Sequence, residues 1–154
     1  MKTLVVFYSR TGFTTQIGKD IAQQIHADIE ELHDAANRMG FFGYLFAGRD
    51  AIRKRLTVIR PTKRNPAHYD CIILGSPNWG SKMAPALRAY IERHKKSFRK
   101  IALFCTQGGS GGHGLLADMA ECCGKKPAAT AVFGQHAPKE KLKQDIASFV
   151  KRIK

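Results

Sequence analysis

Hydroxyl side chains gather around one glycine near the start of this 154-residue sequence, in the stretch Ser9-Arg10-Thr11-Gly12-Phe13-Thr14. Hydroxyl groups can donate hydrogen bonds to an anion without adding charge, and glycine lets the backbone approach a ligand closely or take a positive φ. Where such a turn leads into a helix, unpaired backbone N–H groups and the helix dipole favour a phosphate. The stretch therefore predicts a phosphate-binding loop. The alternative is that these hydroxyls only cap the helix.

Two later turns carry residue types suited to a flat aromatic ligand. The turn Ser76-Pro77-Asn78-Trp79-Gly80 contains the only tryptophan of the chain, and its ring can stack on a heteroaromatic ring. A buried, structural tryptophan is the alternative. The segment 106–114 consists mostly of glycines and small polar residues, so its backbone N–H groups can approach a ligand edge. Its match to the dinucleotide pattern G-x-G-x-x-G at 109–114 is discounted, because it follows the fourth expected strand and lacks an acidic residue about 20 positions later.

Each of the three turns follows an expected strand and precedes an expected helix. In chain order, the expected strands cover residues 4–8, 26–32, 69–75, 100–105 and 128–133. Apolar residues recur at helical spacing between the strands, and a closing helix is expected over 139–153. This alternation predicts a parallel sheet with helices on both faces. Because ligands bind at the carboxyl ends of such strands, we expect the turns 9–15, 76–81 and 106–114 to meet there.

A long connection at about 34–68 forms a basic aromatic insert. One helix face is expected within it, formed by Phe41, Leu45, Gly48, Ile52 and Leu56. Phe42 and Phe46 lie off that face, with Arg49 and Arg53 one turn further along. This apolar ridge beside Arg53-Lys54-Arg55 could rest on a lipid surface or a partner, fold over the site, or be buried under the following loop. The tail at 60–66 is expected to be an exposed loop.

In this order, the three motifs resemble those of the flavodoxin family, and the resemblance covers nearly the whole chain. Other families fit less well: the first turn lacks the Gly-Lys-Ser/Thr ending of a Walker loop and the cysteine of a low-molecular-weight tyrosine phosphatase. Ser9 and Ser76 also stand where a receiver domain would have acidic residues. The resemblance implies one α/β domain over 1–154, a flavodoxin-like three-layer sandwich. Its five-stranded parallel sheet would have the order 2-1-3-4-5, helices would cover both faces, and FMN would be the cofactor.

The resemblance also assigns contacts to FMN by matching positions. The phosphate would be held by Ser9, Arg10, Thr11, Gly12, Phe13 and Thr14, with Arg10 either pairing with it or pointing to solvent. One side of the ring would lie on Ser76, Pro77, Asn78, Trp79 and Gly80, and its pyrimidine edge on Thr106, Gln107, Gly108, Gly109 and Gly112. Many flavodoxins add an aromatic residue in the third loop, which this sequence lacks. His113 or an aromatic of the insert could substitute for it, or the second ring face is open to a substrate. No catalytic side chain and no metal ligand is assigned.

The strongest compositional signal is charge, because 26 Lys and Arg against 12 Asp and Glu give a formal net charge of +14. Such a field favours an acidic redox partner, an anionic membrane surface or, non-specifically, nucleic acid. Nucleic acid is the weakest of these predictions, since no recognised reading motif accompanies the charge. A compartment that tolerates basic surfaces is the alternative. No apolar run approaches the roughly 20 residues of a spanning helix, and the expected first strand occupies the place of a signal peptide, so a cytoplasmic location with reduced cysteines is predicted.

Three functions follow from the resemblance and the charge. The leading hypothesis is an FMN-binding electron-transfer protein that serves redox partners. The alternative is an FMN-dependent oxidoreductase acting between NAD(P)H and a quinone or similar small oxidant, so the sequence leaves open whether the protein is an enzyme. A non-redox binding module that kept the fold is the third. Positive surroundings also predict a less negative reduction potential for the flavin than acidic relatives show.

Overall fold

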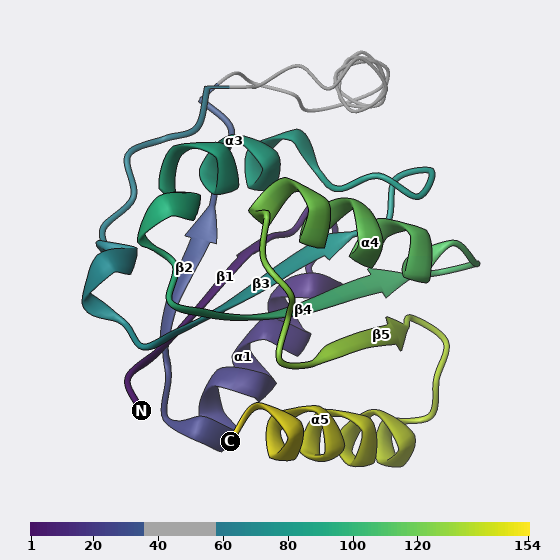
Figure 1. Cartoon of the computed structure of the whole chain (residues 1–154). Coiled ribbons are helices and arrows are strands. Elements are labelled where there is room, and N and C mark those ends of the chain that lie inside the picture. The colour runs from purple at the N-terminus through teal and green to yellow at the C-terminus, as the bar shows by residue number, and fades with distance from the viewer. Residues whose placement is uncertain (36–57) are drawn as a thin grey trace.

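A computed structural model of the protein describes residues 1–35 and 58–154. Its core is a single five-stranded sheet in which each neighbouring pair of strands is parallel, in the order β2-β1-β3-β4-β5 (Figure 1). The strands are β1 Thr3–Tyr8, β2 Asp28–Leu32, β3 Cys71–Pro77, β4 Lys100–Gln107 and β5 Thr130–Gly134. The predicted number, direction and order of the strands are confirmed.

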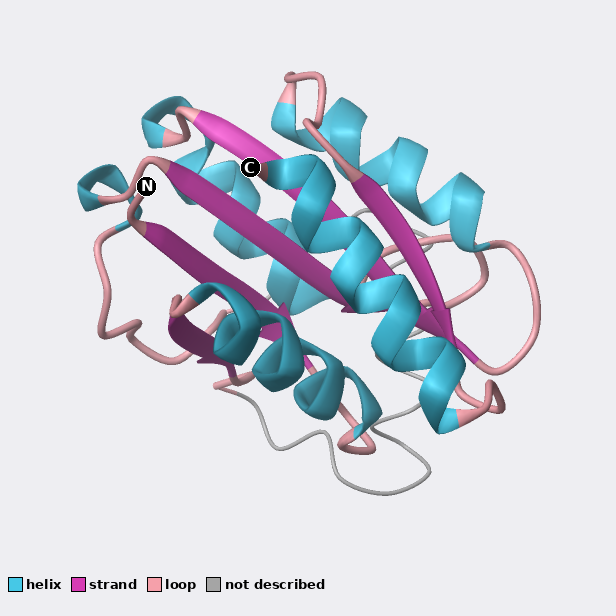
Figure 2. Cartoon of the chain, turned by 90° about the horizontal axis from the view of Figure 1, so that it is seen from below, coloured by secondary structure: helices cyan, strands magenta, loops and turns pink. Residues whose placement is uncertain are grey.

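Helices cover both faces of this sheet, as the sequence predicts (Figure 2). The described α-helices are α1 Phe13–Ile25, α3 Pro85–His94, α4 Gly112–Cys123 and α5 Lys139–Ile153, with short 3₁₀ helices at Pro66–His68 and Lys95–Ser97. α1 and α5 pack on one face, and α3 and α4 pack on the other. None of the helices in the described part of the chain is long and apolar enough to cross a membrane.

The central strands are apolar without interruption because both of their faces are buried. In β1, Leu4 and Val6 belong to the core beneath α3 and α4, whereas Val5 and Phe7 belong to the core beneath α1 and α5. The same alternation continues through β3 and β4, so two apolar layers sandwich the sheet. This packing fixes the strands, and therefore the turns at their ends, as one rigid frame.

The insert is described only at its two ends. The predicted helix face from Phe41 to Leu56 and the ridge from Phe42 to Arg53 lie outside the described residues. The tail at 60–65 is largely exposed, as predicted, but Pro66 is buried and begins a 3₁₀ helix that Asn65 caps. Glu30 of β2 accepts hydrogen bonds from the backbone N–H groups of Lys63 and Arg64, at 3.0 and 2.9 Å, so the tail is held against this edge strand.

Candidate functional site

The three turns predicted from the sequence surround one hollow at the carboxyl ends of β1, β3 and β4. This hollow has a volume of about 430 Å³, within the range of small-molecule and cofactor sites. Its described lining combines residues 10–14, 77–79 and 106–108 with one residue from after β5: Arg10, Thr11, Phe13, Thr14, Pro77, Asn78, Trp79, Thr106, Gln107, Gly108 and Gln135. Segments more than 90 positions apart in the chain therefore share one concave surface.

The first turn leaves the N-terminus of α1 without a side-chain cap. Gly12 is the N-cap residue, and its φ of 97° is in the left-handed region that favours glycine. The hydroxyl of Ser9 accepts a hydrogen bond from the Gly12 N–H at 3.1 Å and so shapes the turn. Among the described residues, no side-chain cap hydrogen bond is made to the start of α1, whose first N–H groups lack intrahelical partners. The hydroxyls therefore do not serve as helix caps, and the arrangement is suited to an anion.

A buried hydrogen bond joins the first turn to the end of β4. The hydroxyls of Thr14 and Thr106 lie 2.8 Å apart, and both residues are buried. Two hydroxyls at this distance satisfy each other, since either one can donate. The hydrogen bond fixes the start of α1 relative to the third turn.

The second turn is a tight hairpin that carries Trp79. Trp79 and Lys82 exchange two backbone hydrogen bonds of 3.1 Å, and the residues between them, Gly80 and Ser81, have φ values of 58° and 61°. Positive φ at both central positions defines a type I′ turn. Asn78 secures this turn, because its side chain accepts from the Ser81 N–H at 2.9 Å and donates to the Ser110 carbonyl at 2.7 Å. The indole ring is packed edge-on against Tyr8, with centroids 5.7 Å apart.

The third turn presents backbone rather than reactive side chains. The Gln107 carbonyl accepts a hydrogen bond from the Gln135 N–H at 2.7 Å, and Gly108 and Gly109 beyond it are exposed. Beneath the turn, burial raises the pKa of the Cys105 thiol to about 12, so this cysteine stays protonated. The described lining holds no carboxylate, imidazole or thiol. Arg10 is its one charged side chain within the described residues.

Comparisons with known proteins agree with this geometry at the level of the fold. No protein-family model and no curated protein matches the sequence significantly. Among solved structures, a flavoprotein from Lactobacillus acidophilus NCFM in complex with FMN matches with a TM-score of 0.76 and 22% identity, over 85% of this chain and 92% of that one. A suspected flavoprotein from Bacteroides eggerthii DSM 20697 matches with a TM-score of 0.78 and 18% identity, over 99% and 97% of the two chains. This chain has the flavodoxin-like fold. A flavodoxin from the domain Archaea also matches, with a TM-score of 0.59 and 18% identity, over 99% and 96%.

Within this flavodoxin-like domain, ten of the sixteen site residues predicted from the sequence line the hollow. The other six do not line it: Ser9, Gly12, Ser76, Gly80, Gly109 and Gly112. Ser76 is fully buried, donates to the Pro77 carbonyl and accepts from the Ala84 N–H, so its hydroxyl shapes the backbone. Gly112 lies under the third turn, where a Cβ would come within 2.7 Å of Gln107 Oε1.

His113, one of the alternatives for the missing aromatic residue, lies away from the hollow, and two residues near the hollow were not predicted. α4 begins at Gly112, so His113 is already in its first turn and lines a separate groove with β5 and α5. It therefore does not replace the missing aromatic residue. Tyr8, which contacts Trp79, and Gln135, which pairs with Gln107, were both missed. An aromatic residue at the end of the first strand was the available signal for Tyr8.

Much of the positive charge of the described flavodoxin-like domain lies away from the hollow. Six exposed cations occupy the opposite edge of the sheet, where the strands begin and the helices end: Lys2, Lys96, Arg99, Lys125, Lys126 and Lys154. Asp70 joins two residues of this edge, because its carboxylate pairs with Arg99 at 3.5 Å and accepts a hydrogen bond from the Lys2 backbone N–H at 2.7 Å.

Proposed function

We propose that this protein binds FMN in the hollow and carries electrons, one or two at a time, between redox proteins. The observation that carries the proposal is the convergence of three strand-end turns on one hollow beside an uncapped helix N-terminus. The first turn would contact the phosphate, the second turn the face of the flat ring, and the third turn the edge of the ring. The flavoprotein from Lactobacillus acidophilus, solved with FMN, supports the choice of cofactor.

The residues present fit FMN part by part. Thr11 and the backbone N–H groups at the start of α1 would hold the phosphate, and Arg10 lines the same end of the hollow. Trp79 offers its ring to one side of the isoalloxazine, and the backbone of Thr106 to Gly108 is available to the polar ring edge. When bound, FMN would supply the one- and two-electron chemistry, while the protein supplies position and access.

The direct test is the absorption spectrum of the purified protein, followed by titration of the FMN-free protein with FMN and with riboflavin. We expect flavin absorption bands, saturable binding of FMN and weaker binding of riboflavin, because riboflavin lacks the phosphate. Binding of neither flavin would refute the proposal. Equal affinity for both would refute the phosphate role of the first turn.

The redox partner is proposed to be an acidic protein, with both acting in the cytoplasm. The formal charge of +14 supports this, since opposite charge accelerates encounter and salt weakens it. Electron exchange with an acidic redox protein should therefore slow as salt concentration rises. A rate that does not change with salt would remove the electrostatic part of the proposal.

An FMN-dependent oxidoreductase that uses NAD(P)H and a quinone is the second candidate. The third turn favours it, because residues 106–111 carry no aromatic side chain and Gly108 and Gly109 are exposed. One face of the ring would then be open to a small oxidant. Steady-state oxidation of NAD(P)H by a quinone, with the purified protein alone, separates the candidates: robust turnover contradicts a pure carrier.

A further inference from the structure

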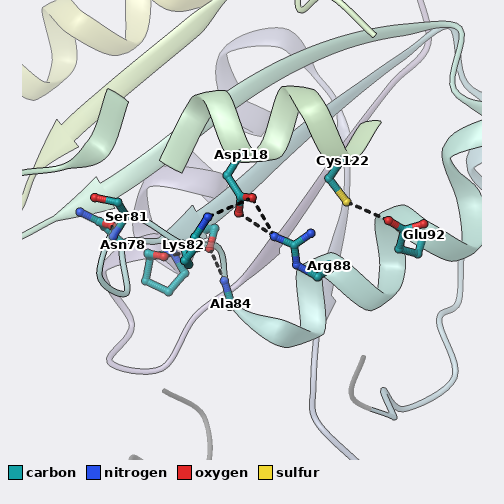
Figure 3. Close-up of polar contacts among 10 residues, drawn as sticks. Asn78, Ser81, Lys82, Ala84, Arg88, Glu92, Asp118 and Cys122 are labelled. Carbon is teal, nitrogen blue, oxygen red and sulfur yellow. Dashed lines mark hydrogen bonds and ion pairs between the residues drawn. The ribbon is translucent and has the colours of Figure 1, made fainter. Parts of the chain in front are cut away.

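The turn that carries Trp79 rests on one face of α4. The N-cap residue of α4 and three positions within the helix, at spacings of three, four and four residues, share this face: Gly111, Gly114, Asp118 and Cys122. Figure 3 shows the last two with their partners, Asp118 beside Lys82 and Arg88, and Cys122 beside Glu92. We call these four positions the α4 stripe.

The glycines of the α4 stripe make room for the second turn. A Cβ at Gly111 would lie 2.5 Å from the Ser81 hydroxyl oxygen, and a Cβ at Gly114 would lie 3.3 Å from the Ser81 Cβ. Ser81 is a central residue of the type I′ turn and sits against α4 because these positions have no side chain. The G-x-G-x-x-G pattern at 109–114, which is not a dinucleotide motif here, thus has a packing role.

Asp118 holds the other end of the same turn. Its carboxylate accepts two hydrogen bonds from Arg88, at 2.9 and 2.7 Å, and lies 3.7 Å from the Lys82 ammonium (Figure 3). Asp118 and Arg88 are each 8% exposed, so their attraction is little screened. Lys82 in turn exchanges both backbone hydrogen bonds with Trp79. A continuous chain of contacts therefore runs from α4 to the tryptophan.

We propose that the α4 stripe positions Trp79 as the wall for the flavin ring, with Asp118 and Gly114 as positioning residues that act through Lys82 and Ser81. This inference rests on the proposed binding of FMN. In this proposal, contacts outside the hollow affect how the flavin ring binds but not how the phosphate binds. Lys82, Arg88, Asp118 and Gly114 are all absent from its described lining.

Two single substitutions test the two contacts without unpairing the buried charge. Lys82→Gln removes the cation on the turn and leaves the Arg88–Asp118 pair intact, whereas replacing Asp118 would leave Arg88 buried and unpaired. Gly114→Ala pushes on Ser81 but favours the helix, since alanine is a better helix former than glycine. Ser81→Gly, added to Gly114→Ala, removes the atom that is pushed. Lys143→Gln, on the exposed side of α5, is the matched charge control.

The first readout needs no flavin, because Trp79 is the only tryptophan and its fluorescence in the folded protein reports the surroundings of this turn. We expect Lys82→Gln and Gly114→Ala to change acrylamide quenching and near-ultraviolet circular dichroism in the FMN-free protein. Lys143→Gln should match the wild type, and Ser81→Gly should restore the Gly114→Ala signal. If α4 only stabilised the fold, Gly114→Ala would leave the Trp79 signals unchanged, because the melting temperature of this variant should equal or exceed that of the wild type.

The second readout is flavin affinity. Both single variants should bind FMN and riboflavin more weakly by the same factor, roughly twofold to tenfold, because only the ring wall moves. Unchanged Trp79 signals together with unchanged affinities would overturn the proposal. If the wild type binds neither flavin, the proposed function fails, and the Trp79 signals alone decide whether α4 positions the turn.

Discussion

Because Thr14 and Thr106 share one hydrogen bond, we expect the effect of replacing one of them on the free energy of unfolding to depend strongly on whether the other is present. Their hydroxyls are 2.8 Å apart, in residues only 2% and 4% exposed. Thr14→Val keeps the shape of the side chain but leaves the Thr106 hydroxyl buried without a partner. Such a group costs about 1–3 kcal/mol of unfolding free energy, whereas replacing both partners with groups of the same shape is nearly neutral. We therefore expect each single variant to lose about 1–3 kcal/mol, and the double variant to lose less than either one.

The assay is urea unfolding of the FMN-free protein, followed by Trp79 fluorescence, so that binding energy does not enter. The matched control is Thr15→Val, because the Thr15 hydroxyl donates to Glu31 at 3.0 Å in a half-buried position where water can replace it. Its cost should be smaller than that of Thr14→Val, because no buried group is left without a partner. An unchanged dependence of the free energy on urea would show that the same surface unfolds. Additive losses at Thr14 and Thr106, or a Thr14→Val cost equal to that of Thr15→Val, would refute the reasoning.

Two further predictions concern the first turn and the thiols. Gly12→Ala places a side chain at a backbone φ of 97°, at a cost of about 1–2 kcal/mol. The variant should bind FMN more weakly and riboflavin as well as the wild type does. An equal loss of affinity for both flavins would contradict a phosphate role for this turn. Burial raises the pKa of Cys71 and Cys122 to about 11 and of Cys105 and Cys123 to about 12. In the unfolded chain the thiols ionise near pH 8.5. The stability that the buried, protonated thiols contribute is therefore fully present below that pH and is lost as pH rises to about 12. Urea unfolding free energy should therefore fall by about 1.4 kcal/mol per pH unit for each titrating thiol, and Cys105→Ala should have a shallower slope; an unchanged slope would contradict the assignment.

The elements of this fold were predictable where one pattern dominated. α5 begins at Lys139 and ends at Ile153, as its apolar spacing predicts, and its buried residues are Ile146, Phe149, Val150 and Ile153. β3 was predicted to begin at Tyr69 but begins at Cys71, because the Tyr69 N–H bonds back to the Pro66 carbonyl of the preceding 3₁₀ helix. Local backbone hydrogen bonds of this kind leave no periodic trace in a sequence. Strand and helix identities were therefore right while boundaries moved.

The site was predictable as three converging turns but not as a set of side chains. Parallel topology alone requires strand ends to share an edge, and this made the convergence foreseeable. The type I′ turn was hidden, since Ser81 takes a positive φ that serine rarely adopts. Gln135 was hidden as well, because its place beside Gln107 depends on the pairing of β4 with β5. Contacts between turns depend on tertiary packing, which cannot be predicted from the sequence of any one segment.

The net charge shows that composition gives the number of charges but not their positions in the fold. A formal charge of +14 led to the expectation of positive surroundings for the flavin, yet six exposed cations of the described chain lie at the amino edge of the sheet. β4 has eight residues, so at about 3.3 Å per residue that edge lies about 26 Å from the hollow. Salt screens exposed charges beyond about 8 Å at physiological ionic strength. If FMN binds as proposed, those cations would have little influence on its reduction potential, and Arg10 and the N-terminus of α1 would be the positive groups beside it in the described structure.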